Sequence, residues 1–459
     1  MPVNSFSDYP MSWSPSRDEL TGGPTYLALA AALERDIVSG ALKPGVRLPP
    51  QRELADFLDL NFTTITRAYG ICREKGLLYG VTGSGTFVAQ NLGESSSFGG
   101  DVIELGVVQS FPETGGGIVA AAARDVLSRE YASRLFSYGE RDGTPGHREA
   151  GRKWLEWCGV SVPSSRVAVF PGTQSALSAA LLSVFGPGDA LAVDLFTYSN
   201  LIHLARLAHV RLVPVAGDEC GMLPAKLADA VVKGGVKGVY LMPVCANPTT
   251  VTMPETRKDE LAEVIKRNDL ILLEDDSRHS QIRRAERTLF DRIPEQTVYL
   301  CGSTRSIASG LRVSYMASPE LLSERLLNGL HHLSIKAGAF EAEILGELVL
   351  SGAAERILVE KTRQAREANR IFDRVFGRAG RSGSDCFFRT LPIDCVLGKG
   401  SDVERQCLEA GVRVCHSDRF SVRKGVKDTF LRVSLSSAGD MKRLKEGLDI
   451  LRRFIGEHG

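Results

Sequence analysis

The stretch that decides the fold is Val298-Tyr-Leu-Cys-Gly302-Ser-Thr-Arg305-Ser-Ile-Ala-Ser-Gly-Leu-Arg312-Val-Ser-Tyr315. Its apolar beginning predicts a short buried strand that ends at Gly302. A loop of small, hydroxylated residues follows, and the apolar run that opens at Leu311 predicts a second strand. The loop carries Arg305, and Arg312 stands seven positions later. No lysine occurs in the loop, and this absence restricts the chemistry that it can perform.

The length and composition indicate a soluble protein with several domains. The chain has 459 residues, which is too long for one ordinary core. Its hydrophobic content of 43% and charged content of 24% are typical of globular proteins. No apolar run approaches the roughly 20 residues that a membrane helix needs. The N-terminus shows no signal-peptide pattern, so we expect a cytoplasmic protein without a membrane partner.

The cysteines and the standard catalytic motifs narrow the chemistry further. Nine cysteines are scattered along the chain without a CxxC pair, so we expect reduced thiols. HExxH and GxSxG motifs are both missing, and we predict no metal site. The net charge of +1 gives no overall sign of nucleic-acid binding.

Beyond residue 103, short apolar segments alternate with helical patterns, which predicts an α/β fold with a mostly parallel sheet. Ligands in such sheets bind beyond the carboxyl ends of the strands. Each of the residues found there, taken alone, is equally consistent with a helix cap or a core side chain. The predicted strands are 167–170, 190–193, 211–215, 238–242, 270–274, 298–300 and 311–315.

The residues after these strands resemble, in their order, the cofactor site of fold-type I pyridoxal-phosphate (PLP) aminotransferases. The resemblance implies a PLP-dependent transferase fold with a small C-terminal subdomain over about 340–459. In that family a lysine seven residues before the phosphate-binding arginine forms a Schiff base with PLP, and here Arg305 takes its position. Thr250 and Ser277 depart from the family pattern. The implied cofactor-binding residues are Thr173, Gln174, Tyr198, Asn247, Asp275 and Arg312, and Arg432 is the implied partner of a ligand carboxylate.

The segment from residue 25 to 89 predicts a winged helix-turn-helix. Apolar residues recur at helical spacing in three stretches, Asn61 is a good N-cap for the third, and 77–88 reads as a hairpin with a glycine tip. The pattern resembles the GntR family, with Phe62 at a position that is often polar. The resemblance implies that the second helix of the pair enters the major groove of DNA. The implied DNA-binding residues are Arg52, Thr63, Thr64, Thr66, Arg67, Ser84, Gly85 and Thr86.

Charge favours the alternative that the helix pair is only a packing unit. Residues 1–90 hold eight basic and nine acidic side chains, without the basic excess of a typical DNA-binding domain. We weigh the order of the motif more heavily than this balance, and we expect double-stranded DNA as the partner.

Arg305 decides between a regulator and an enzyme. A Schiff-base lysine must lose its proton to attack the aldehyde, whereas arginine stays protonated. A GntR-like winged helix joined to an aminotransferase-like domain resembles the MocR-type regulators. We expect a homodimer that, because of Arg305, binds PLP non-covalently, or an amino-acid-like effector, and has no catalytic residue. An active PLP-dependent aminotransferase with an accessory DNA-binding head is the alternative. A third reading is a dimeric DNA-binding protein whose large domain binds nothing.

The expected organisation is a flexible tail over 1–24, the winged helix over 25–89, a Ser/Gly-rich linker over 90–102, and the aminotransferase-like domain over 103–459. The sequence does not reveal the operator, the effector, whether PLP is bound, or whether the protein activates or represses.

Overall fold

The computed structural model forms two compact units, residues 1–97 and 98–459, and each is described by itself. The linker expected over 90–102 lies outside the described residues except for its last position. The described residues are 11–20, 23–43, 45–81, 85–89, 102–111, 115–276, 287–377, 385–393, 399–423, 425–426 and 428–458.

The first unit contains three helices and a hairpin around one core. Asn61 caps the third helix by accepting a hydrogen bond from the Thr63 amide at 2.9 Å, as its sequence position predicts. Buried side chains from every helix meet, among them Leu29, Leu54 and Ile65. The elements are α1 (Thr25–Val38), α2 (Gln51–Leu58), α3 (Phe62–Glu74), β1 (Leu78–Val81) and β2 (Gly85–Val88).

The segment before the first helix corrects the expectation of a flexible tail. Residues 11–20 include the short helix η1 (Arg17–Leu20), and Trp13 is 7% exposed within the core of this unit. The Trp13 indole nitrogen also donates to Asp36 at 2.9 Å. A buried tryptophan with a satisfied N–H orders the chain around it. The described part of the segment is therefore folded, whereas residues 1–10 and 21–22 lie outside the description.

The second unit is built on a 7-stranded sheet with the order β4-β12-β11-β10-β9-β5-β6. Only β12 runs antiparallel to its neighbours, so the sheet is mostly parallel, as predicted. Its strands are β4 (Val167–Phe170), β5 (Ala190–Asp194), β6 (Arg211–Val215), β9 (Val236–Leu241), β10 (Ile271–Asp276), β11 (Thr297–Gly302) and β12 (Ser314–Ala317).

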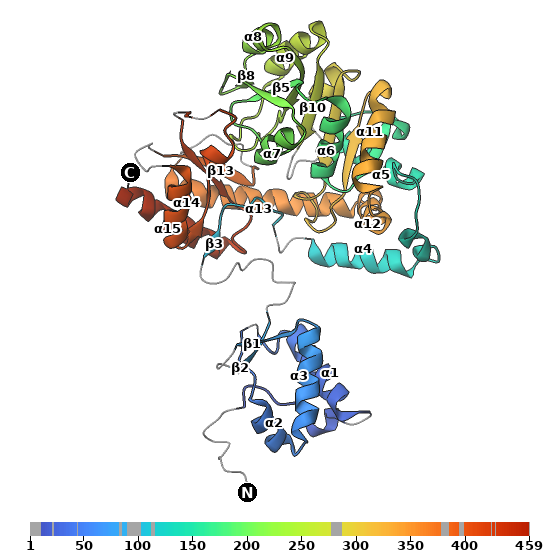
Figure 1. Cartoon of the computed structure of the whole chain (residues 1–459), viewed down its shortest axis with the longest axis vertical. Coiled ribbons are helices and arrows are strands. Elements are labelled where there is room, and N and C mark those ends of the chain that lie inside the picture. The colour runs from blue at the N-terminus through green and yellow to red at the C-terminus, as the bar shows by residue number, and fades with distance from the viewer. Residues whose placement is uncertain are drawn as a thin grey trace. The chain divides into compact units, whose positions relative to one another are not determined.

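Helices cover both faces of this sheet, as Figure 1 shows for the upper part of the molecule. Along β11 the buried side chains alternate: Val298 and Leu300 pack with the cluster under α6, whereas Tyr299 and Cys301 pack with the cluster under α5 and α12. The helices are α4 (Gly116–Ser128), α5 (Pro145–Trp157), α6 (Thr173–Val184), α7 (Ser199–Leu207), α8 (Pro224–Gly234), α9 (Glu255–Arg267), α10 (Leu289–Arg292), α11 (Glu320–Ser334) and α12 (Ala339–Leu350), with the 3-10 turns η2 (Ala132–Phe136) and η3 (Ser164–Arg166).

The strand expected to open at Leu311 begins three residues later, at Ser314. Arg312 has a φ of 51°, in the left-handed region, and does not belong to the strand. The apolar side chains Leu311 and Val313 are buried on either side of it, which explains why the sequence suggested a strand. Because of this turn, Arg312 lies outside the strand, and its side chain lines a cavity.

A smaller subdomain follows the long helix α13 (Ala353–Phe376) and has its own apolar cluster, which includes Phe372, Leu431 and Leu448. Its sheet has the order β13-β16-β15. The remaining elements are β3 (Ile103–Glu104), β7 (Gly217–Asp218), β8 (Gly221–Met222), β13 (Phe388–Pro392), α14 (Gly400–Glu409), β14 (Val412–Arg413), β15 (Cys415–His416), η5 (Ser417–Arg419), β16 (Phe430–Ser434) and α15 (Met441–His458).

The cysteines depart from the expectation of reduced thiols. Cys245 and Cys386, which are 141 residues apart in sequence, form a disulfide with their Cα atoms 6.4 Å apart. Cys245 follows a strand of the large sheet, and Cys386 precedes β13 of the smaller subdomain. Sequence spacing does not reveal a pair that only the tertiary fold brings together.

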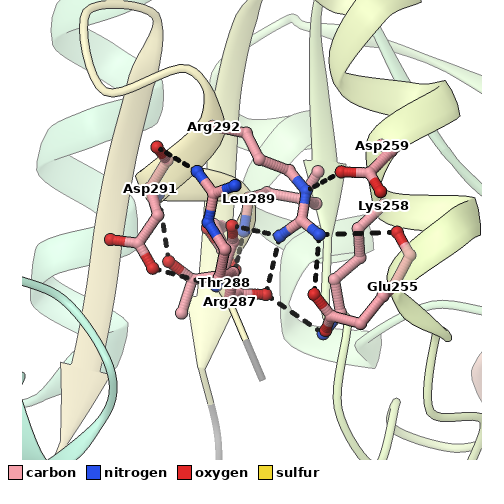
Figure 2. A network of polar contacts seen from close by, with 9 residues as sticks. Glu255, Lys258, Asp259, Arg287, Thr288, Leu289, Asp291 and Arg292 are labelled. Carbon is pink, nitrogen blue, oxygen red and sulfur yellow. Dashed lines mark hydrogen bonds and ion pairs between the residues drawn. The ribbon is translucent and has the colours of Figure 1, made fainter. Parts of the chain in front are cut away.

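A polar network with buried cations and exposed carboxylates joins α9 to the turn before α10 (Figure 2). Arg292 binds Glu255 at 2.7 Å and Asp259 at 2.6 Å, and Lys258 binds Glu255 at 2.9 Å. The Lys258 and Arg292 side chains are 1% and 6% exposed, so their charges need these partners. The network anchors the chain from Arg287 to Arg292, which leads into β11.

Candidate DNA interface and ligand site

Most of the candidate DNA-reading residues on α2 and α3 are exposed to solvent. Arg52, Thr63, Thr66 and Arg67 are exposed, and Thr64 is half-buried. The Arg52 guanidinium lies 5.8 Å from the centre of the Phe62 ring. Phe62, which is 43% exposed, therefore acts as a platform for the arginine through a cation–π contact.

Two further contacts order side chains on the same face. The Arg67 guanidinium lies 5.7 Å from the centre of the Tyr26 ring on α1. The Thr66 hydroxyl lies 2.8 Å from Gln51 Oε1 and 3.0 Å from the Phe62 carbonyl. These contacts restrict the conformations of exposed polar side chains on this face.

The wing carries a cation that the sequence analysis missed. Arg47 pairs with Phe87 in an isolated antiparallel bridge beside β2. Gly85 has a φ of 120°, and a Cβ there would lie 2.9 Å from Arg47 Nε. Arg47 therefore lies across Gly85, beside Thr86, and only proximity in space could have revealed it. Ser84, expected at the same tip, lies outside the described residues.

A cavity of about 290 Å³ lies at the carboxyl ends of the strands in the large unit. It brings together most of the residues that the sequence analysis assigned to one site, from segments more than a hundred residues apart. The lining residues are Val108, Thr173, Gln174, Tyr198, Asn200, Asp275, Gly302, Thr304, Arg305 and Arg312.

One part of the cavity is suited to an anion. Thr173 begins α6, where free amide groups and the helix dipole favour negative charge. Gly172 precedes it with a φ of 85°, and a Cβ there would lie 3.0 Å from Arg312 Nη2. The guanidinium of Arg312 therefore lies against the start of the helix, and a larger residue at 172 would displace it. Phosphate is the group that such a combination binds well.

Asp275 supplies the acidic group of the cavity. It is 2% exposed and accepts a hydrogen bond from the Tyr240 hydroxyl at 2.7 Å. Burial raises the pKa of Tyr240 well above its usual value, and the charge on Asp275 adds to the effect. Tyr240 therefore keeps its proton and donates a hydrogen bond to the Asp275 carboxylate. It was missed because its strand pairing with β10 is not readable from the sequence.

Tyr198, Asn200 and Gln174 form a hydrogen-bonded group along the wall. Asn200 Nδ2 donates to the Tyr198 hydroxyl at 3.0 Å, and that hydroxyl donates to Gln174 Oε1 at 3.3 Å. Burial raises the pKa of Tyr198, while the nearby charge of Arg305 opposes the shift. Asn200 was not expected, although its position two residues after Tyr198 was a signal.

Arg305 lines the cavity and makes no salt bridge with any residue that the structure describes. The same is true of Arg312. The pKa of the Arg432 guanidinium is lowered, first by burial and then also by the charge of Arg305. Among the described residues, the cavity is lined by the guanidinium groups of Arg305 and Arg312 and by the buried carboxylate of Asp275, with Arg432 close enough to feel the charge of Arg305.

Asn247 and Arg432 meet in the large unit without being part of the cavity lining. Arg432 Nη1 donates to Asn247 Oδ1 at 2.9 Å, and Nη2 donates to the Gly106 carbonyl. The guanidinium also lies 4.7 Å from the centre of the Phe420 ring. The bond between Asn247 and Pro248 is cis. Thr250, which replaces the glycine of the family motif, adopts a φ of 61° and so accepts the conformation that glycine would take.

The lysine that follows this loop in the sequence does not line the cavity. Lys336, the nearest lysine in the sequence to this loop on its C-terminal side, donates to the Ser137 carbonyl at 3.1 Å and lines a different cavity. His279 and Ser277 lie outside the described residues. Within the described part of the chain, no group of three or more His, Cys, Asp or Glu side chains could hold a metal ion. None of the described helices is long and apolar enough to cross a membrane.

Each of the two parts of the chain matches a known protein family. Residues 25–88 match the bacterial regulatory proteins of the gntR family, and residues 101–451 match aminotransferase class I and II. A crystal structure of an archaeal alanine:glyoxylate aminotransferase superposes with a TM-score of 0.73 at 19% identity, covering 79% of this chain and 92% of that one. The fold is therefore that of the PLP-dependent transferases, joined to a winged helix.

Relatives that share both parts are named as regulators. The uncharacterized HTH-type transcriptional regulator YdeF of Bacillus subtilis (strain 168) is 33% identical over 463 residues and covers 100% of both chains. The vitamin B6 salvage pathway transcriptional repressor PtsJ of Salmonella typhimurium is 24% identical over 333 residues, covering 71% of this chain and 74% of that protein. The chain belongs to the MocR subfamily of GntR-family transcriptional regulators.

Proposed function

We propose that this regulator senses an anionic, PLP-like ligand in the cavity at the strand ends and performs no transamination there. One observation carries the proposal. Arg305 and Arg312 line the cavity. Among the described lining residues the acidic one is Asp275, and it already accepts a hydrogen bond from Tyr240. Guanidinium groups without acidic partners in a concave site favour a ligand that brings its own negative charge.

The residues of the cavity fit PLP as that ligand. Thr173, Gln174 and Arg312 would hold the phosphate, Asp275 would face the pyridinium nitrogen, and Tyr198 would stack on the ring. Asn247 would bind the phenolic oxygen after exchanging its bond with Arg432, which would then take a ligand carboxylate. Bound PLP supplies an electron sink in enzymes of this fold. The relative PtsJ is named as a transcriptional repressor of the vitamin B6 salvage pathway, which supports a PLP-like effector.

Arg305 is the reason for proposing a sensor without catalysis. A permanently protonated side chain has no free electron pair to attack an aldehyde and cannot take a proton from a substrate. We therefore expect PLP to bind without a covalent bond to the chain.

Borohydride reduction tests this expectation. The full-length protein is incubated with PLP, reduced and digested, and its peptides are examined by mass spectrometry. We expect no pyridoxyl group in the native chain. In Arg305→Lys we expect such a group on residue 305, together with a new visible absorption band. A pyridoxyl adduct on a cavity residue of the native protein would contradict the proposal.

We further propose that Arg52, Arg67 and the wing residues Arg47, Gly85 and Thr86 contact a two-half-site operator. Arg67→Ala should weaken binding by about 1–3 kcal/mol if it reads a base. Arg47→Ala should lower the salt dependence by about one phosphate contact. The control is Arg73→Ala, an exposed arginine in the last turn of the same helix α3.

Gel shifts with genomic fragments at several salt concentrations make this measurement. The idea is wrong if the native protein retards no fragment better than random DNA. If Arg73→Ala weakens binding as much as Arg67→Ala does, the contact surface has been assigned incorrectly.

We also propose a homodimer that acts in the cytoplasm, where its DNA lies. A two-fold dimer would match two half-sites and double the phosphate contacts. Phe136 and Tyr138 are 69% and 87% exposed, which supports a covered surface around η2. Light scattering of the full chain at micromolar concentration should give twice the monomer mass, and a monomer would contradict the proposal.

A further inference from the structure

The disulfide between Cys245 and Cys386 joins the segment that contains Asn247 to the segment that leads into β13 of the smaller subdomain. Its Cα–Cα distance of 6.4 Å lies within the range of ordinary disulfides. Cys245 stands two residues before Asn247, in the segment that follows β9. Cys386 stands two residues before Phe388, the first residue of β13.

The surroundings of the pair connect it to the cavity. Cys245, Cys386 and the fully buried Phe388 form one apolar cluster, against which Val108 packs. Val108 also lines the cavity. The ring of Phe388 lies 5.9 Å from the guanidinium of Arg432, which in turn binds Asn247. The disulfide therefore ties the Asn247 segment to the strand that supports Arg432.

A DNA-binding regulator works in a compartment where small thiols and thioredoxins keep cysteines reduced. Disulfides that form there are usually transient and serve catalysis or redox sensing. We propose that Cys245 and Cys386 form a redox-modification site, oxidised by peroxides, that locks the Asn247 segment to the small subdomain and slows exchange of the ligand. The effect on the ligand rests on the function proposed above, whereas the oxidation itself does not.

The disulfide forms in two steps. The thiolate of one cysteine attacks a peroxide, ROOH, forming a sulfenic acid and releasing the alcohol ROH once a proton is added. The second thiolate attacks the sulfenic sulfur, so the S–S bond forms and water leaves. In total two thiols and one peroxide give one disulfide, one alcohol and one water. A dithiol reductant returns two electrons and two protons by thiol–disulfide exchange.

The coupling to the ligand follows from burial. Cys245 and Cys386 are 8% and 5% exposed, so a reductant reaches the bond only when the Asn247 segment and β13 separate. A ligand that binds Asn247 and Arg432 together opposes the same separation. Oxidation and ligand binding therefore stabilise one arrangement, and each should strengthen the other.

The first experiment identifies the linked cysteines. Fully reduced full-length protein is treated with hydrogen peroxide, alkylated, digested without reductant and analysed by mass spectrometry. We expect a peptide that links Cys245 to Cys386, and its disappearance after dithiothreitol. Cys158 and Cys301, whose sulfurs are 3.4 Å apart in the core, provide an internal comparison. If Cys245 and Cys386 are both alkylated after peroxide, or stay linked in dithiothreitol, the proposal is overturned.

The second experiment measures the coupling. PLP should dissociate from the oxidised protein about fivefold more slowly than from the reduced protein, near the lower end of ordinary couplings. Cys386→Ser should behave as the reduced protein under both conditions, and Cys245→Ala replaces it if Cys386→Ser does not fold.

Hydrogen exchange separates this proposal from the one on which it rests. Without any ligand, the amides of β13 and of residues 245–253 should exchange more slowly after oxidation. Failure of PLP to bind would count against the proposed function only. The hydrogen-exchange rates would then still test whether the disulfide holds the Asn247 segment against the small subdomain. Equal exchange in oxidised and reduced protein would refute the lock.

Discussion

The candidate functional residues of the winged helix lie close together in the sequence, whereas those of the ligand cavity come from distant segments. In the winged helix, the residues assigned to DNA occupy the loop before α2, the helices α2 and α3 and one hairpin, all within 40 positions from Arg47 to Thr86. In the cavity, Val108 and Arg312 line the same space although they are more than 200 positions apart in the chain. The first site is local in sequence, and the second exists only after a sheet has formed.

This difference explains how each site tolerates change. A helix-turn-helix exposes its side chains on a small core of its own, so surface substitutions alter binding while the core holds. The cavity residues lie at strand ends, and Asp275 among them is only 2% exposed. Substitutions there disturb binding and stability together, because the same buried groups serve both.

The largest expected effect tests whether the two units are independent. Ile65 in the winged helix and Leu300 in the large sheet are both fully buried. Replacing either with alanine should lower the free energy of unfolding of its own unit by about 2–5 kcal/mol. Calorimetry of the full chain should show one transition moving and the other unchanged. A shift of both transitions in either variant would mean that the units unfold together.

A smaller effect should distinguish buried polar groups in the two regions. Tyr240→Phe removes a hydrogen bond to the buried carboxylate of Asp275 and should cost about 1.5–3 kcal/mol in the large unit. The matched change is Tyr69→Phe in the winged helix, where the hydroxyl donates to the Pro49 carbonyl at 3.0 Å. That neutral bond should be worth about 0.5–1.5 kcal/mol. Denaturant unfolding measures both, and equal costs would remove the electrostatic role of Tyr240.

The smallest effect concerns pH. Burial raises the pKa of Glu255, but hydrogen bonds from Arg292 and Lys258 outweigh it and lower the pKa to about 2. A lowered pKa stabilises the folded state above the unfolded value near 4.5, and this contribution disappears as pH falls through about 2. Because the side chain is 40% exposed, we expect only about 0.2–1 kcal/mol.

Acid titration of the large unit within the full chain tests this prediction. Glu255→Gln should lose stability at neutral pH and little near pH 2, so its difference from the native protein should shrink as acid is added. Glu260→Gln, on the same helix and 60% exposed, is the control. A difference that stays constant with pH would show that the ion pairs of Figure 2 do not stabilise the fold.

Much of this architecture was predictable because its signals are local. Helical spacing, Asn61 as a cap and the glycine-rich hairpin predicted the winged helix, and strand-end residues predicted the cavity wall. The mistakes came from contacts distant in sequence. Trp13 was assigned to a flexible tail because its hydrogen-bond partner, Asp36, is 23 residues away in the sequence. The turn at Arg312 was taken for a strand because the buried apolar residues Leu311 and Val313 flank it.

The sequence by itself determined the order of the two domains and the family, and it predicted that Arg305 stands at the position of the Schiff-base lysine. These depend on residue identity at fixed spacing, which needs no coordinates. Only the tertiary structure decided that Cys245 meets Cys386, that Tyr240 supports Asp275, and that Arg47 lies on the wing. Lys361 is also buried in the folded chain, where its amine contacts Ser110 and the Ile307 carbonyl. Burial lowers the pKa of this amine to about 7. Such pairings depend on how distant segments pack, and no local pattern encodes them.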